Sequence, residues 1–216
     1  MYTIHMFPDG RVQLVDQRTV PHTTRHVSLE AILEVFQAQT ISSPALPKGT
    51  IQYWRGNGFS VVALQHPAHI REMYMYEQSY RLPVPDTLFL FRVLHREQGE
   101  ITLCDSAVFA MDGPWQGDDT QLYGFPYGNV FDEHTICWGD YNVTLPNFYN
   151  IDTMMDMFLG TPFNTDLAGH FDSGSEALSL DEFWSDLDQG TEFPVAMLEP
   201  VCVYKDLQQF MAEDIF

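Results

Sequence analysis

The stretch that decides the fold of this chain is Tyr123-Gly-Phe-Pro-Tyr-Gly-Asn129-Val-Phe-Asp-Glu-His-Thr-Ile-Cys137-Trp-Gly-Asp140. From Pro126 to Pro146 the sequence is rich in Gly, Asn, Asp, Pro and aromatic residues, and it follows neither the helical nor the strand period. A stretch of this kind between regular elements is typical of an ordered loop that carries function. The pattern therefore predicts a functional loop that contains Cys137.

Two strong strands are predicted before this loop. The segments Thr87–Leu94 and Glu100–Ala110 are rich in β-branched and aromatic residues, and a polar loop around Glu97-Gln98-Gly99 joins them. Gln121–Phe125 is predicted as a third strand. We therefore expect an α+β fold in which an antiparallel meander over residues 86–125 leads into the loop.

Helices are predicted after the loop. Asn150 is the predicted N-cap of the first, Gly160 follows its end and Pro162 stops it, and five apolar residues keep helical spacing between them: Ile151, Met154, Met155, Phe158 and Leu159. Ser179-Leu-Asp-Glu182 is a capping box that opens a second helix. One face of that helix carries Leu180, Phe183, Trp184 and Leu187. A last amphipathic stretch carries Leu207, Phe210, Met211 and Ile215.

The N-terminal part predicts two hairpins and a helix. The hairpins pair Tyr2–Phe7 with Arg11–Val15 and Thr50–Trp54 with Phe59–Leu64, and the helix covers about Ser28–Ala38.

A boundary is expected at Leu82-Pro-Val-Pro-Asp86, because its prolines interrupt the pattern. We therefore divide the chain into an N-terminal α+β extension, residues 1–82, and a domain over residues 83–216 whose C-terminal part is helical.

Acidic charge is concentrated in the second half of the chain. Residues 1–99 carry nine Arg/Lys and eight Asp/Glu, a net charge of +1, whereas residues 100–216 carry one Lys and 22 Asp/Glu, a net charge of −21. A field of this sign repels phosphate backbones, so we expect no nucleic-acid partner. The charge is expected to attract a basic protein surface, with solubility as the alternative explanation.

The N-terminus and the cysteines indicate a cytoplasmic protein. The first residues lack the basic segment of a signal peptide, and no apolar run is long enough to span a membrane. Cys104, Cys137 and Cys202 are far apart and form no CxxC pair, so neither a disulfide framework nor a zinc cage is expected. The patterns around Cys104 and Cys202 predict a core residue and a strand residue, respectively. His66 and His69 lack a third ligand, so no metal site is predicted.

The loop resembles the active-site signature of ubiquitin-conjugating enzymes. That signature has a His-Pro-Asn turn, a β-branched residue after the Asn, and a cysteine eight positions after the Asn. Asn129, Val130 and Cys137 match it, and Ile136 precedes the cysteine as the family prefers. The wider layout is similar to the prokaryotic family D of this superfamily, known as PRTRC system protein B, over roughly residues 83–167. The shared features are the Pro-rich entry to a strand, the Asn-Val…Ile-Cys-Trp-Gly run, Pro146, and a helix ending in Phe158-Leu-Gly-Thr-Pro-Phe163.

The resemblance implies a ubiquitin-conjugating-enzyme-like fold and a transferase activity. Cys137 would accept a ubiquitin-like protein from an activating enzyme as a thioester and pass it to an amine. The Asn129 amide would stabilise the oxyanion, an effect on the order of 3–4 kcal/mol for a well-placed donor, with capping of the turn as the alternative role. Asp140 is a candidate to orient or deprotonate the amine. No cofactor is implied, since the activating enzyme consumes the ATP.

The resemblance also implies partners and leaves alternatives open. The family's operons imply a ubiquitin-like protein, a ThiF-like activating enzyme and a JAB-type metalloprotease. The family's His and Pro positions are Tyr127 and Gly128 in this chain. This departure favours the alternative of a catalytically inactive conjugating-enzyme-like fold that acts as a protein-binding module in a plasmid- or phage-linked system. A third interpretation is a cysteine hydrolase that uses Cys137 and His134.

Overall fold

The chain divides into two units, Met1–Pro44 and Ala45–Phe216. The computed structural model describes residues 2–7, 12–16, 23–28, 45–56, 58–167, 169–174 and 178–207. In the first unit, three strands form an antiparallel sheet in the order β1-β2-β3: β1 (Tyr2–Met6), β2 (Val12–Asp16) and β3 (Thr23–Val27). The first predicted hairpin is confirmed, whereas the helix predicted at Ser28–Ala38 lies outside the described residues.

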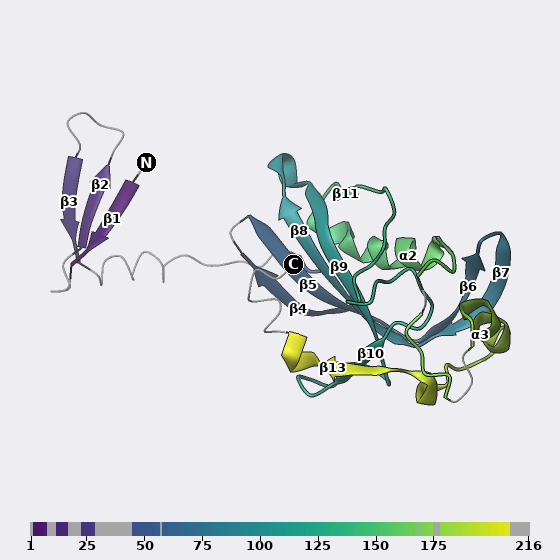
Figure 1. Ribbon diagram of the computed structural model, residues 1–216. Helices are drawn as coiled ribbons and strands as arrows, with labels where there is room; N and C mark the ends of the chain where they lie inside the picture. Colours follow the sequence, from purple (N-terminus) through teal and green to yellow (C-terminus); the bar gives the residue numbers. More distant parts are fainter. Residues whose placement is uncertain are drawn as a thin grey trace. The chain divides into compact units, whose positions relative to one another are not determined.

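The second unit is built on a large sheet with the strand order β13-β10-β9-β8-β5-β4 (Figure 1). Each neighbouring pair in this order is antiparallel. A short strand, β11, pairs with the start of β9. The bounds are β4 (Thr50–Arg55), β5 (Phe59–His66), β8 (Asp86–His95), β9 (Ile101–Met111), β10 (Gln121–Gly124), β11 (Thr144–Leu145) and β13 (Pro200–Val203).

A smaller sheet and short helices complete the second unit. The hairpin of β6 (His69–Met75) and β7 (Gln78–Val84) is joined by β12 (Pro162–Phe163), which runs parallel to β6. The helices include α2 (Thr153–Gly160) and α3 (Leu180–Leu187), and the 3-10 turns of the described residues are η1 (Glu97–Gly99), η2 (Phe148–Asp152) and η3 (Val195–Met197). The described chain is therefore α+β, as predicted, with mostly antiparallel sheets and few helices.

Side chains of the central strands alternate between two cores. In β5, Val62 and Leu64 belong to the larger core, whereas Val61 and Ala63 belong to the smaller one. Helix α2 packs on the larger core, and its Phe158 ring lies 5.9 Å from the ring of Phe89 in β8. We call the side of Val62 the helix face of the sheet and the side of Val61 the opposite face. Because both faces are covered, the central strands are near-continuous apolar runs in the sequence.

Strand β5 joins the segment before residue 82 to the segment after it. It pairs with β8 from Phe59↔Leu94 to His66↔Thr87. Residues 45–82 thus share a sheet and a core with the rest of the second unit, and the division of the structure differs from the boundary expected between residues 82 and 83. Pro83 is tolerated because, among the described strands, β7 pairs only with β6, and an edge strand can lack a backbone donor.

Both helices predicted after the loop are present, but α2 begins differently from the prediction. Turn η2 runs directly into α2, so the N-cap is Asp152 and not Asn150. Asn150 instead accepts a hydrogen bond from Thr153 Oγ1 through its backbone oxygen, at 2.6 Å. At α3 the capping box is confirmed, since the Glu182 carboxylate accepts hydrogen bonds from the backbone N–H and the hydroxyl of Ser179.

The C-terminal prediction is covered only as far as Leu207, which is buried in the smaller core. Phe210, Met211 and Ile215 lie outside the described residues. Cys202 lies in β13, as its surroundings in the sequence predict. Within the part of the chain that is described, no helix has the length and apolar character needed to cross a membrane.

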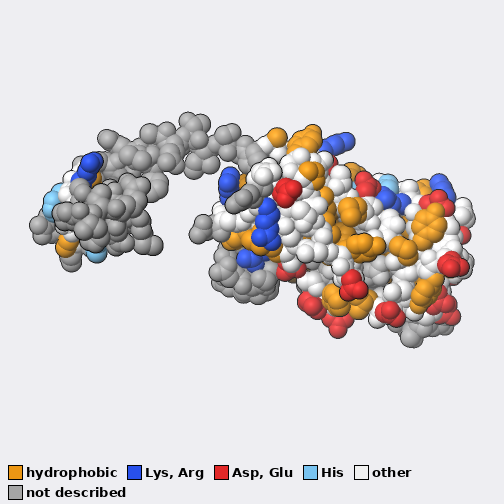
Figure 2. Space-filling view, turned by 90° about the horizontal axis from the view of Figure 1, so that it is seen from above, with side chains coloured by type: hydrophobic (Ala, Val, Ile, Leu, Met, Phe, Trp, Pro, Cys, Tyr) orange, Lys and Arg blue, Asp and Glu red, His pale blue; other side chains and the backbone are white. Residues whose placement is uncertain are grey.

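Most of the negative charge belongs to the second unit. Residues 1–44 carry three Arg and four Asp/Glu, a net charge of −1, whereas residues 45–216 carry seven Arg/Lys and 26 Asp/Glu, a net charge of −19. Figure 2 shows one face of this unit, on which acidic side chains are spread among apolar ones and do not form a single block. On this face the acidic side chains are scattered, and Lys and Arg side chains gather at one end of the unit (Figure 2).

Candidate active site

Residues 129–137 form a short hairpin with Asn129 and Cys137 opposite each other at its base. The Cys137 backbone N–H donates a hydrogen bond to the Asn129 carbonyl oxygen at 2.9 Å. Val130 and Ile136 form the next antiparallel bridge toward the tip. The eight-residue spacing seen in the sequence is therefore the spacing that brings these two residues together across a hairpin.

The second arm of the hairpin is attached to the edge of β9. Thr135 forms an antiparallel bridge with Ala107, and the Ile136 N–H donates to the Ser106 carbonyl oxygen at 2.9 Å. The Trp138 indole N–H then donates to the Ser106 hydroxyl oxygen at 2.8 Å. These bonds fix the position of the arm on both sides of Cys137.

Cys137 is a half-buried free thiol. Its neighbours in the chain turn to the helix face, where Ile136 is buried in the larger core and Trp138 packs against that core. Because side chains alternate along an extended arm, Cys137 points away from the larger core and toward the opposite face. A nucleophilic cysteine needs this kind of partial access to solvent.

Tyr127 anchors the start of the hairpin. Its side chain is completely buried, and its hydroxyl donates to the Pro83 carbonyl oxygen in β7 at 2.5 Å. Its ring packs edge-on against the rings of Phe125, Trp184 and Phe193. Burial raises the pKa of the Tyr127 phenol well above its ordinary value, so the hydroxyl stays a neutral donor. Tyr127 thus holds the turn in place through packing and one hydrogen bond.

Gly128 and Asn129 form the turn itself. Gly128 has a φ of +95°, and a Cβ there would lie 2.9 Å from the Leu167 backbone oxygen, so the position requires glycine. Asn129 has a φ of +53°, a conformation that Asn adopts more readily than most residues. The Asn129 amide nitrogen donates to the Pro162 carbonyl oxygen at 3.1 Å. In this arrangement the amide ties the hairpin to β12 and supports the shape of the turn.

Residues 26–201 match the family model of the prokaryotic E2 family D. This chain belongs to that family. Searches of curated proteins and of solved structures return no match. The resemblance drawn from the Asn129–Cys137 spacing is confirmed, and the match extends well beyond residues 83–167 toward the N-terminus. Membership supports an E2-like fold for the second unit.

Asp140 of this family D protein lies in the turn that follows Cys137. The turn is closed by a hydrogen bond from the Tyr141 N–H to the Trp138 carbonyl oxygen at 3.3 Å, and Gly139 within it has a φ of +60°. Asp140 is exposed. The structure thus brings Asn129 and Cys137 together and leaves Asp140 on the solvent side of the neighbouring turn.

His134 is placed for packing. It lies at the tip of the hairpin, three residues before Cys137 in the sequence, which corresponds to about 10 Å along an extended chain. Its ring lies 5.1 Å from the Phe109 ring and 4.8 Å from the His170 ring. Burial, with a smaller contribution from His170, lowers the pKa of His134. These contacts assign His134 a packing role, and the cysteine hydrolase with Cys137 and His134 stays an untested interpretation.

The prediction that Cys104 is a core residue is wrong. Cys104 lies in β9, but its side chain is exposed. The register between β8 and β9 shifts here, since Arg92 pairs with Asp105 and Val93 pairs with Leu103. Cys104 is the extra residue of this β-bulge, and a bulged residue is left out of the regular alternation.

Sequence reasoning assigned no role to three residues of this region. Ser106 and Trp138 hold the arm that carries it, and Asp105 lies next to Ser106 on β9. The available signal was the pair Asp105-Ser106 inside a strand that is otherwise apolar, because polar residues within a buried strand need partners.

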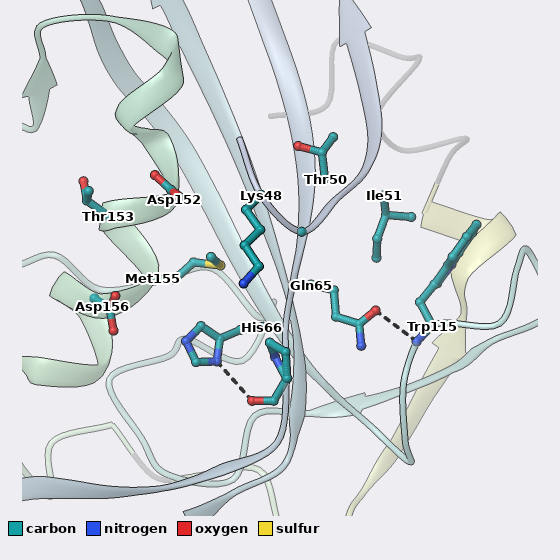
Figure 3. A pocket seen from close by; sticks show the side chains of 12 residues that line it. Lys48, Thr50, Ile51, Gln65, His66, Trp115, Asp152, Thr153, Met155 and Asp156 are labelled. Carbon is teal, nitrogen blue, oxygen red and sulfur yellow. Dashed lines mark hydrogen bonds between the residues drawn. The ribbon is translucent and has the colours of Figure 1, made fainter. Parts of the chain in front are cut away.

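A separate cavity of about 720 Å³ lies between α2 and the ends of β4 and β5 (Figure 3). The Lys48 side chain extends into it, toward Met155 on one side and His66 on the other. No residue between 126 and 146 lines this cavity, so it is not the site predicted from the sequence. Throughout the described ranges, no three His, Cys, Asp or Glu side chains come together as a metal site.

Proposed function

We propose that this protein carries a ubiquitin-like protein as a thioester on Cys137 and transfers it to an amine. The observation that carries the proposal is the half-buried free thiol at the base of a hairpin, opposite Asn129, at the spacing of the E2 signature. Family membership supports an E2-like fold around it.

The proposed chemistry needs only the thiol and the two protein partners. The Cys137 thiolate attacks the activated C-terminus of the modifier, and an amine later attacks the thioester and releases the thiolate. A ThiF-like activating enzyme and a ubiquitin-like protein are the proposed partners, with a JAB-type metalloprotease in the same operon. No small cofactor is proposed for this chain, since ATP is consumed in the activating step.

The test is a reconstitution with the activating enzyme, the ubiquitin-like protein and ATP, analysed on a non-reducing gel. The wild-type chain should form an adduct that thiols cleave, whereas Cys137→Ser should form a weaker ester that resists thiols, or none. Cys104→Ala and Cys202→Ala are matched controls and should load like the wild type. Burial raises the pKa of the Cys202 thiol, which disfavours it as the nucleophile. An adduct that persists in Cys137→Ala would refute the assignment.

A second candidate function is that of a catalytically inactive E2-like binding module. It is favoured by Tyr127 at the family's His position and by the hydrogen bond that occupies the Asn129 amide. Alkylation of the native protein separates the two candidates, since a carrier needs a reactive Cys137. A Cys137 that resists alkylation while the exposed Cys104 is labelled would favour the binding module.

A further inference from the structure

Extending the register of the hairpin by one residue beyond its last recorded hydrogen bond to β9 places Asp105 across from Cys137. Thr135 pairs with Ala107, and Ile136 bonds to Ser106, so each step toward Cys137 on the hairpin is one step toward Asp105 on β9. Side chains of directly opposite residues in an antiparallel pair have Cβ atoms about 4.5–5.5 Å apart.

The alternation of side chains puts both residues on the same face of the sheet. On β9, Ser106 binds the Trp138 indole on the helix face, whereas Ala107 belongs to the smaller core on the opposite face. Asp105, next to Ser106, therefore shares the opposite face with Ala107. Cys137 lies on that face too, because its neighbours Ile136 and Trp138 both turn to the helix face.

The surroundings of Asp105 suit a base. It is half-buried, and its carboxylate accepts a hydrogen bond from the Ser106 backbone N–H at 2.8 Å. Arg92 of β8 pairs with it across the sheet and so lies on the same face. The negative charge of Glu133 in the hairpin contributes to raising the pKa of Asp105. Burial raises the pKa of the Asp105 carboxyl, while the Ser106 N–H and the Arg92 charge oppose the shift. A carboxylate with a raised pKa accepts protons more readily than an exposed one.

We propose that Asp105 is the catalytic base that takes a proton from the attacking amine during discharge of the Cys137 thioester. This inference rests on the proposed function. In the step, the amine nitrogen forms a bond to the thioester carbonyl carbon and gives a proton to the Asp105 carboxylate. The carbon–sulfur bond then breaks, the product is an amide, and the Cys137 thiolate leaves and is reprotonated from solvent.

Asp105 is better placed for this role than Asp140. Asp140 is exposed on a turn, whereas Asp105 is half-buried on a strand whose register with the nucleophile is fixed by hydrogen bonds on both sides. A base on a rigid element holds its distance to the reacting atoms better than one on an exposed turn.

The experiment separates loading from discharge without the protein partners. Cys137 is loaded with a short peptide thioester that ends in glycine, excess thioester is removed, and free lysine is added while mass spectrometry follows loss of the adduct. Asp105→Asn should load at the wild-type rate but discharge to lysine about 100-fold more slowly. Asp105→Glu should restore part of the rate. Asp112→Asn, an exposed aspartate just after the same strand, is the matched control and should behave like the wild type.

The pH profile distinguishes a base from a structural residue. The discharge rate of the wild type divided by that of Asp105→Asn should fall as the pH is lowered toward the raised pKa of Asp105, because the carboxylate becomes protonated and stops acting as a base. Protonation of the free lysine slows both proteins equally, so it cancels in this ratio. Discharge of Asp105→Asn within about twofold of the wild type, or equal losses of loading and discharge, would overturn the role. Absence of any adduct on wild-type Cys137, here and with the activated modifier, would refute the proposed function itself.

Discussion

The two faces of the large sheet differ in what they contain. The helix face is filled with aromatic rings such as Phe89, Phe91 and Phe158 under α2. The opposite face has a smaller core, and beside it Arg92 of β8 pairs with Asp105 of β9, the strand to which the arm that carries Cys137 is attached. Adjacent residues of one strand face opposite sides of the sheet. A short segment can therefore support the core on one face and the proposed chemistry on the other. Ser106 fastens the hairpin on the helix face, and its neighbour Asp105 is the proposed base on the opposite face.

The largest effect should come from Tyr127, whose ring is part of the core of the helix face. Tyr127→Ala should lower the free energy of unfolding by about 3–5 kcal/mol, because it removes a fully buried ring that packs against other aromatic rings. Tyr127→Phe keeps the ring and leaves the Pro83 oxygen without its donor, so about 1–3 kcal/mol should be lost. Urea unfolding measures both values.

Tyr149→Ala is the matched control for this pair, since Tyr149 is 61% exposed. Its effect should stay within about 0.5 kcal/mol. If Tyr127→Ala cost no more than Tyr149→Ala, Tyr127 would not anchor the hairpin to the core.

Asn129 ties the hairpin to β12, and its replacement should have an intermediate effect. Asn129→Ala loses the hydrogen bond to Pro162 and places a Cβ-bearing residue without a local partner at positive φ, at a cost of about 1–2 kcal/mol. Loading and discharge should fall together, because the position of Cys137 depends on this turn. Glycine adopts this positive φ without strain, so Asn129→Gly should lose only the stability contributed by the hydrogen bond from the side-chain amide to Pro162.

Rates of loading and discharge, measured beside unfolding, decide the role of Asn129. The exposed Asn142 of the same loop supplies the control Asn142→Ala, which should leave both rates unchanged. Normal loading with discharge slowed about 100-fold would instead assign the amide to the oxyanion.

The smallest effect should come from the exposed side of α3, whose buried side belongs to the larger core. The carboxylates of Glu182 and Asp188 accept hydrogen bonds from the backbone N–H groups of Ser179 and Arg81, respectively. Neutralising Glu182 or Asp188 would weaken these bonds and disturb the structure. Asp181→Asn combined with Asp186→Asn should slow association with the activating enzyme by about twofold to fivefold at low salt, because steering weakens.

Stopped-flow association rates across a salt series provide the check. The wild-type rate should fall as salt rises, and the difference from the double variant should vanish near 1 M, where the Debye length is about 3 Å. Association rates of both proteins that stay flat across the series would reduce the acidic charge to a solubility feature.

Local pattern was sufficient for part of the fold. Strands β8 and β9 and the capping box of α3 depend on residues close together in the chain, and their predictions agree with the structure. The hairpin of β6 and β7 was not predicted, because Arg71, Glu72 and Arg81 break its apolar pattern and Pro83 resembles a boundary. The pairing of β5 with β8 spans that whole hairpin, so no local pattern indicates it.

For the candidate site, the sequence by itself determined the spacing of Asn129 and Cys137, the β-branched neighbour Val130, and through them the family. Only the tertiary structure decided that Tyr127 is a buried anchor and that the arm carrying Cys137 is attached to β9 at Ser106 and Ala107. The physical reason is that a hairpin's own register is set by residues a few positions apart, whereas its register against β9 is set by the core that both must bury.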